Sequence, residues 1–162
     1  MAHELGEALH VVHAARVVHR DVKPSNILLD PAPTGRGFRA KLADFGIARL
    51  TDSTRLTTPG TVIGTAAFLS PEQVRGDEPG PPADVYALGL VLIEALTGRR
   101  VYDHASLPET LLARLREQPQ VPGDFGYGWR SLLTAMTVDD PAGRPTALEV
   151  AERARSLMGG EA

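Results

Sequence analysis

The chain has 162 residues, of which 43% are apolar and 23% charged, and this balance indicates one folded globular domain rather than a disordered segment. A formal net charge of −3 provides no basic surface of the kind that binds nucleic acid, so nucleic acid is excluded as an expected partner. The sequence contains no cysteine and no apolar run close to the ~20 residues of a membrane span, so we expect no membrane segment and a cytoplasmic location.

The first predicted element is an amphipathic helix. Apolar residues recur at helical spacing over residues 5–17 and lead into an extended Val17-Val18 pair. Two short apolar runs, residues 27–29 and 38–42, flank a turn rich in proline and glycine, and they predict a small β-hairpin. Residues 50–64 and 76–82 have little periodicity and are predicted to be loops.

The second half of the chain is predicted to be helical. Residues 85–96 are strongly apolar and should form the buried central helix, with Asp84 as its N-cap and Gly98 as its C-cap. Three more helices are expected over residues 107–117, 127–137 and 146–158, the last opened by a capping box of Thr146 and Glu149. The predicted fold is mainly α with a small β-hairpin, in one domain over residues 1–158 with a frayed tail over 159–162.

Several motifs occur in a fixed order along the chain. They are HRDVKPSNILL, ADFGIAR, GTAAFLSPEQ, DVYALGLVLIEALTG and DPAGRP. In this order they resemble the eukaryotic-like Ser/Thr protein kinases of bacteria, and the resemblance covers nearly the whole chain. It implies the C-terminal lobe of a protein kinase, lacking the N-terminal β-sheet lobe, because the catalytic-loop motif already begins at His19.

The resemblance assigns catalytic roles to residues of the first two motifs. Asp21 would accept or orient the hydroxyl proton of a substrate Ser or Thr, and Lys23 would contact the transferred phosphate of ATP. Asn26 and Asp44 would ligate the Mg²⁺ that bridges the nucleotide phosphates. An isolated aspartate or asparagine is usually a solvated or turn-forming loop residue, so it is the joint spacing that favours catalysis.

Other residues would support this centre. By resemblance, His19 packs beneath the site, and Gly46 after Phe45 gives the metal-binding turn its backbone freedom. Thr65 would hydrogen-bond the catalytic aspartate and lysine. Thr65 and Lys23 together favour Ser/Thr over tyrosine specificity.

Regulatory and anchoring roles follow from the same resemblance. Arg20 before the catalytic aspartate is typical of kinases switched by loop phosphorylation, with Thr57, Thr58 and Thr61 as candidate sites. Glu72 and Arg144 are expected to form a buried ion pair that anchors the substrate-binding loop. Asp84 is expected to hold the backbone of the catalytic loop near Arg20. The remaining histidines, His3, His10, His13 and His104, show no metal-ligand spacing and are interpreted as surface or packing residues.

Three interpretations of function remain open. The chain is part of a Ser/Thr kinase, through a miscalled start or a split gene; or it is a pseudokinase-like binding module that uses the groove at 65–72 and the helical face at 107–129; or it is a remnant without function. Without a Gly-rich loop and a strand lysine, we expect weak binding of ATP and Mg²⁺ and negligible activity from residues 1–162 alone. The expected partners are a protein substrate with Ser or Thr and a separate N-terminal lobe or other partner protein.

Overall fold

The computed structural model of the chain describes residues 1–32, 37–43, 66–104 and 106–160. Seven of the residues discussed above lie outside these ranges: Asp44, Phe45, Gly46, Thr57, Thr58, Thr61 and Thr65. The loop predicted over 50–64 lies outside them as well.

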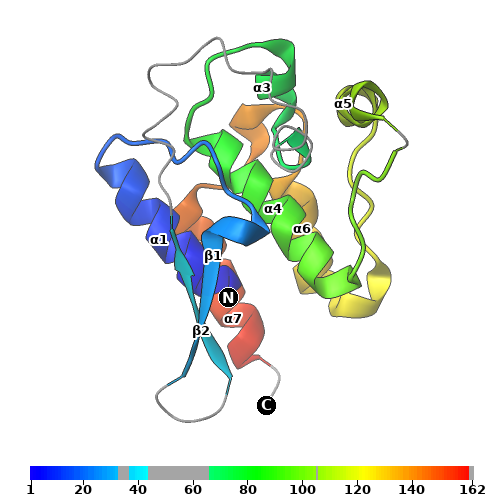
Figure 1. Ribbon diagram of the computed structural model, residues 1–162. Coiled ribbons are helices and arrows are strands. Elements are labelled where there is room, and N and C mark those ends of the chain that lie inside the picture. The colour runs from blue at the N-terminus through cyan, green and yellow to red at the C-terminus, as the bar shows by residue number, and fades with distance from the viewer. Residues whose placement is uncertain (33–36, 44–65, 105, 161–162) are drawn as a thin grey trace.

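A helix buried along most of its length organises the fold. Helix α4 (Pro81–Thr97) has an unbroken run of buried residues from Ala83 to Ile93. Such a helix, apolar on every side, belongs in a core. Helices α1 (Ala2–Ala14) and α6 (Gly126–Met136) pack against α4, and α7 (Ala147–Gly159) packs against both of them (Figure 1).

One apolar core joins these four helices. Its fully buried side chains include Leu5 and Leu9 of α1, Val85 and Leu88 of α4, Leu132, Leu133 and Met136 of α6, and Val150 of α7. Gly6 allows α1 to approach the backbone of α7, because a Cβ atom at residue 6 would lie 2.9 Å from the backbone nitrogen of Ala151. Helix α1 therefore lies directly on the backbone of α7. This close packing fixes the position at which the segment after α1 begins.

The predicted hairpin is confirmed. Strands β1 (Ile27–Pro31) and β2 (Phe38–Leu42) pair antiparallel, with Ile27 opposite Leu42 and Pro31 opposite Phe38. The sheet packs against α1, where the backbone N–H of Ala40 donates to Glu4 Oε2 at 3.0 Å. The short 3-10 helix η1 (Pro24–Asn26) leads into β1, so the hairpin and the loop before it are fixed to the same helix.

The prediction of Asp84 as an N-cap is wrong. Helix α4 begins at Pro81 with Gly80 as its N-cap, so the loop predicted over 76–82 ends two residues earlier. The reason is the Pro81-Pro82 pair, since the fixed φ of proline and its missing N–H suit the first turn of a helix. Gly98 is confirmed as the C-cap, with a left-handed φ of 66°.

The other predicted helices are present with small shifts. Helix α5 spans Leu107–Arg116, α6 starts one residue early, and α7 starts after Thr146, whose capping box with Glu149 is confirmed. Among the described residues, four short elements were not predicted: η1, α3 (Pro71–Arg75), η3 (Gly123–Phe125) and η4 (Pro141–Gly143). The mainly α fold with a small hairpin is confirmed, and within the described residues no helix is long and apolar enough to cross a membrane.

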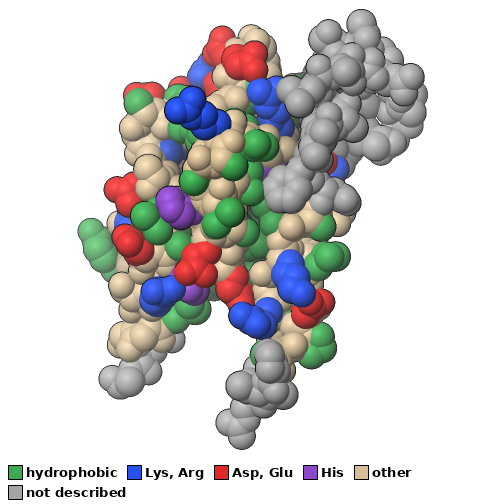
Figure 2. All heavy atoms as spheres, turned by 90° about the vertical axis from the view of Figure 1, so that its left-hand side faces the viewer, with side chains coloured by type: hydrophobic (Ala, Val, Ile, Leu, Met, Phe, Trp, Pro, Cys, Tyr) green, Lys and Arg blue, Asp and Glu red, His purple; other side chains and the backbone are tan. Residues whose placement is uncertain are grey.

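Charged side chains of both signs are interspersed over the face that carries α1. Figure 2 shows this face, on which acidic, basic and histidine side chains alternate with apolar ones. Such mixing is typical of a solvated surface and differs from the single-sign patch that binds a nucleic-acid backbone.

Helix α1 ends at Ala14, three residues before the end of the apolar pattern predicted over 5–17, and the turn that follows contains a strained residue. The N–H of Arg16 donates to His13 O at 2.9 Å, and that of Val17 donates to Val12 O at 3.1 Å. This Schellman pattern requires a left-handed residue, and Arg16 supplies it with a φ of 59°. Glycine is the usual residue here, because a side chain at positive φ meets the backbone.

We expect Arg16→Gly to raise the free energy of unfolding by about 0.5–1 kcal/mol, since it relieves this strain at an exposed position. Chemical denaturation monitored by circular dichroism measures the change. Arg16→Ala is the matched control, because it removes the same charge and keeps the Cβ atom. Equal shifts for the two variants would show that the backbone at residue 16 is not strained.

Candidate active site

A buried carboxylate holds the loop between α1 and η1. The backbone N–H groups of His19 and Arg20 donate to Asp84 Oδ2 and Oδ1, each at 2.8 Å. Arg20 adopts a left-handed φ of 64°, which turns both N–H groups toward the same carboxylate. Because Asp84 is 1% exposed on the central helix, the loop that carries Asp21 is tied to the core as predicted.

His13 also contacts this carboxylate, a role that the sequence did not reveal. Its Nε2 lies 2.8 Å from Asp84 Oδ2, in an ion-pairing geometry across 71 positions of sequence. The ring projects from the last turn of α1, so Asp84 joins α1, α4 and the loop. The sequence carried no signal for this contact, because no pattern pairs a histidine with a residue so far along the chain.

His19 occupies the centre of the loop and is fully buried. Its Nδ1 accepts from the N–H of Asp21 at 3.3 Å, and its Nε2 donates to Ala43 O at 3.2 Å. One imidazole therefore braces both the loop of Asp21 and the residue that precedes Asp44. This placement supports the structural role predicted for His19.

Three of the predicted site residues meet at Asp21. Lys23 Nζ lies 3.0 Å from Asp21 Oδ2, and Asn26 Nδ2 donates to the same oxygen at 3.0 Å. Asn26 Nδ2 also donates to Asp21 O at 2.8 Å, which fixes the amide plane. The carboxylate and the ammonium group are each about one-fifth exposed, so the cluster is firmly held and still open to a substrate.

The residues at this cluster suit a magnesium ion only in part. The Asn26 side chain makes both of its hydrogen bonds to described residues through Nδ2. Its Oδ1 remains as an oxygen ligand of the kind that Mg²⁺ prefers. In the described part of the chain, no group of three His, Cys, Asp or Glu side chains could hold a metal ion. A metal here would use Asn26 together with Asp44, which lies outside the described residues.

Arg20 projects toward solvent from the same loop. Its Nη2 lies 2.9 Å from Oε1 of Glu78, a carboxylate that is 85% exposed. A surface pair of this kind adds at most about 1 kcal/mol to stability and is readily exchanged for another anion. The side chain predicted to bind a phosphorylated loop is therefore held near the site by a weak, replaceable contact.

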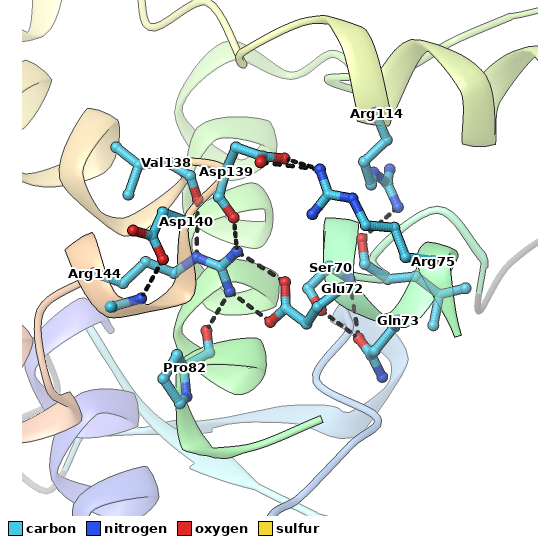
Figure 3. Close-up of polar contacts among 12 residues, drawn as sticks. Ser70, Glu72, Gln73, Arg75, Pro82, Arg114, Val138, Asp139, Asp140 and Arg144 are labelled. Atoms are coloured by element: carbon cyan, nitrogen blue, oxygen red, sulfur yellow. Dashed lines mark hydrogen bonds and ion pairs between the residues drawn. The ribbon is translucent and has the colours of Figure 1, made fainter. Parts of the chain in front are cut away.

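The predicted ion pair between Glu72 and Arg144 is confirmed (Figure 3). Arg144 Nη1 and Nη2 donate to Glu72 Oε1 and Oε2 at 2.7 and 2.9 Å. The remaining N–H groups donate to the carbonyls of Val138, Pro82 and Asp139. Burial alone would raise the pKa of Glu72, but the hydrogen bonds and charge of Arg144 outweigh it and the pKa lies below its usual value.

Sequence reasoning missed a second buried arginine. Arg114, in the last turn of α5, donates to the carbonyls of Ala66, Ala67 and Leu69, and its guanidinium lies over the Tyr102 ring at 4.6 Å. Burial lowers the pKa of Arg114 below its ordinary value. No motif marked this residue, because an arginine in an amphipathic surface helix is normally solvent-exposed.

Trp129, at the end of the helical face proposed above as a binding surface, packs against the main core and is only partly exposed. It therefore contributes to the core of the domain.

A sequence profile of the protein kinase domain matches residues 1–154. The chain therefore belongs to the protein kinase family, whose C-terminal lobe the helical fold and the Asp21 cluster resemble.

The chain is similar to several serine/threonine kinases of bacteria. It is 40% identical over 145 residues to the serine/threonine-protein kinase PknA of Mycobacterium tuberculosis, covering 89% of this chain and 32% of that protein. It is 42% identical over 154 residues to the probable serine/threonine-protein kinase PkwA of Thermomonospora curvata, and the match covers 93% of this chain and 19% of PkwA. It is 38% identical over 162 residues to the serine/threonine-protein kinase PkaB of Streptomyces coelicolor, and the match covers 96% of this chain and 38% of PkaB. The chain thus spans well under half the length of each.

Asp84→Asn should loosen the catalytic loop, because an amide group offers one acceptor oxygen where two N–H groups now bind a carboxylate. We expect a loss of about 3 kcal/mol in unfolding free energy and faster hydrogen exchange at residues 17–23. Asp77→Asn, an exposed carboxylate after α3, is the matched control. Unchanged exchange in the loop would contradict the anchoring role of Asp84.

The Glu72–Arg144 pair predicts a pH dependence of stability. Because the pKa of Glu72 is lower in the folded chain than its ordinary 4.5, the stabilisation is fully present above that value and is lost as pH falls through the folded pKa. Glu72→Gln should cost about 3 kcal/mol at neutral pH, and its difference in stability from wild type should shrink as the pH falls below 4.5 and through the lowered pKa of Glu72. Urea titrations at several pH values measure both. A difference that is independent of pH would refute this account.

Proposed function

We propose that this chain is the catalytic lobe, over residues 1–158, of a serine/threonine protein kinase that transfers the γ-phosphoryl group of ATP to Ser or Thr hydroxyls of a protein substrate. One observation carries the proposal: Asp21, Lys23 and Asn26 form a single hydrogen-bonded cluster on a loop that Asp84 fixes to the core. Phosphoryl transfer depends mainly on positioning and charge stabilisation, and this cluster offers both.

Asp21 is assigned to the substrate hydroxyl. Its side-chain contacts with Lys23 and Asn26 both use Oδ2, so Oδ1 is the oxygen that would accept the hydroxyl proton or orient it. The N–H of Asp21 is bound to His19, which prevents the residue from turning away. An aspartate held in this way can act as the base of a transfer reaction.

Lys23 and Asn26 are assigned to the nucleotide side. The Lys23 ammonium group is a positive charge that would follow the phosphate as it moves toward the hydroxyl. Asn26 Oδ1 and Asp44 would hold Mg²⁺, which neutralises phosphate charge when it is bound. Thr65 would add a hydrogen bond to the Asp21–Lys23 pair, and Thr65 and Lys23 support the preference for Ser and Thr.

Arg20 is assigned to regulation. Its contact with the exposed Glu78 is weak, and a phosphate carries more charge than a carboxylate. Phosphorylation of Thr57, Thr58 or Thr61 would therefore displace Glu78 and bind Arg20. This exchange would tie the phosphorylated residue to the loop that carries Asp21.

A second lobe or partner protein is needed to enclose the nucleotide. Leu28 and Leu29, which directly follow the Asn26 cluster, are 52% and 53% exposed. Apolar surface beside a catalytic loop is typically covered by another part of the protein or by a partner. We propose that an N-terminal kinase lobe covers this apolar surface. We also propose that the protein acts in the cytoplasm, a reducing compartment in which a fold without disulfides suffices.

The kinase proposal is tested by radiolabelled phosphate transfer from Mg-ATP to a library of Ser and Thr peptides. We expect no measurable transfer by residues 1–162 alone, and transfer when the chain is fused to the N-terminal lobe of the mycobacterial relative. In the fusion, Asp21→Asn should lower kcat by about 10²–10⁴-fold, because the base is lost and the shape is kept. Glu152→Gln, on the exposed side of α7, is the control.

Two outcomes would contradict the proposal. A fusion with Asp21→Asn that is as active as wild type would remove Asp21 from the reaction. A well-folded fusion that binds peptide and transfers nothing would favour the pseudokinase-like binding module.

A further inference from the structure

The buried guanidinium of Arg114 makes an unusual set of contacts. Its Nη1 donates to Ala66 O at 2.9 Å and to Leu69 O at 2.7 Å, and its Nη2 donates to Ala67 O at 2.6 Å. All three acceptors belong to one four-residue stretch of backbone, although Arg114 itself lies in α5, which stands apart from the central helices (Figure 1). A single side chain thus holds the conformation of a segment more than forty positions away.

Burial of this charged group costs free energy, so packing alone does not explain an arginine at this position. Arg114 is 2% exposed, and none of the described carboxylates lies within ion-pairing distance of its guanidinium. Its charge is balanced by carbonyl dipoles and by the Tyr102 ring, while its Nε has no hydrogen-bond partner within the described part of the chain. An apolar side chain of similar length would avoid these costs. The retained arginine therefore points to a role in the precise placement of the backbone that it binds.

The segment 66–69 lies beside the proposed catalytic base. Phe68 and Leu69 line a small cavity of about 10 Å³ together with Arg20 and Asp21. The next residues form the capping box of α3 and carry Glu72, so Arg144 anchors the segment from its other end (Figure 3). A peptide whose hydroxyl reaches Asp21 would therefore lie close to this backbone.

The far side of Arg114 is also braced. The Tyr102 hydroxyl donates to Glu117 O at 2.8 Å and lies 3.3 Å from the Tyr86 hydroxyl of the central helix. Tyr86 in turn lies under the guanidinium of Arg144 at 4.8 Å. The two arginines that hold the segment 66–75 are therefore fixed through adjacent aromatic rings.

We propose that Arg114 is a positioning residue that sets the backbone of residues 66–69 as the peptide-binding surface beside Asp21. The proposal rests on the proposed function for the identity of the bound peptide. The placement of the backbone by Arg114 is independent of it. Helix α5 thereby controls how a substrate is held while taking no part in the chemistry.

Hydrogen exchange of the complete 162-residue chain, followed by mass spectrometry, tests the placement. Arg114→Met should raise exchange over residues 66–75 at least tenfold while leaving α7 within twofold of wild type. Arg114→Lys keeps the charge without the planar fork and should give an intermediate rise. Arg116→Met, which removes an exposed arginine from the same helix, is the control and should change nothing. A uniform rise across α4 and α7, or no rise at 66–75 in either Arg114 variant, would overturn the proposal.

Kinetics on the fusion described above separate positioning from general stability. With the Ser/Thr peptide that the fusion phosphorylates fastest, Arg114→Lys should raise KM about tenfold and leave kcat within twofold. An unchanged KM alongside altered exchange would overturn the link to substrate binding. A fusion that phosphorylates no peptide would refute the kinase proposal, and the exchange measurement alone would then decide the role of Arg114.

Discussion

The architecture of the site depends on the buried carboxylate of Asp84. It lies on the central helix, where removal from water is costly, and the backbone of His19 and Arg20 together with the ring of His13 satisfy it. These hydrogen bonds explain why Arg20 keeps a positive φ, although it lies in a loop. The orientation of Asp21 follows from it, because the next residue of the loop has little freedom left.

Two buried arginines attach residues 66–75 to the helices of the domain. Arg144 meets a carboxylate, and all five of its N–H groups have acceptors, so its charge is fully compensated. Arg114 meets backbone carbonyls with three of its five N–H groups, and its Nε has no hydrogen-bond partner among the described residues. The first arrangement contributes stability through an ion pair, whereas the second fixes the path of the backbone at a cost in desolvation.

The motifs and the apolar periodicity predicted much of this molecule. A run of apolar residues around Leu88 predicts a core helix in any context, and the Thr146–Glu149 capping box acts over four residues. The Glu72–Arg144 pair was predictable through family resemblance, since nothing in local sequence links residues so far apart. The N-cap assigned to Asp84 failed because two prolines initiated the helix earlier and the carboxylate found stronger donors elsewhere.

The sequence by itself therefore determined the longer helices, the hairpin, the family and the cluster of Asp21, Lys23 and Asn26, because these depend on contacts within a few residues or on a motif read as a unit. Tertiary structure alone decided which distant groups support that cluster. The pairing of His13 with Asp84 and of Arg114 with the segment 66–69 spans 71 and 45–48 positions. Such contacts form when helices pack, and their partners are selected by burial and hydrogen-bond satisfaction, which short-range pattern cannot encode.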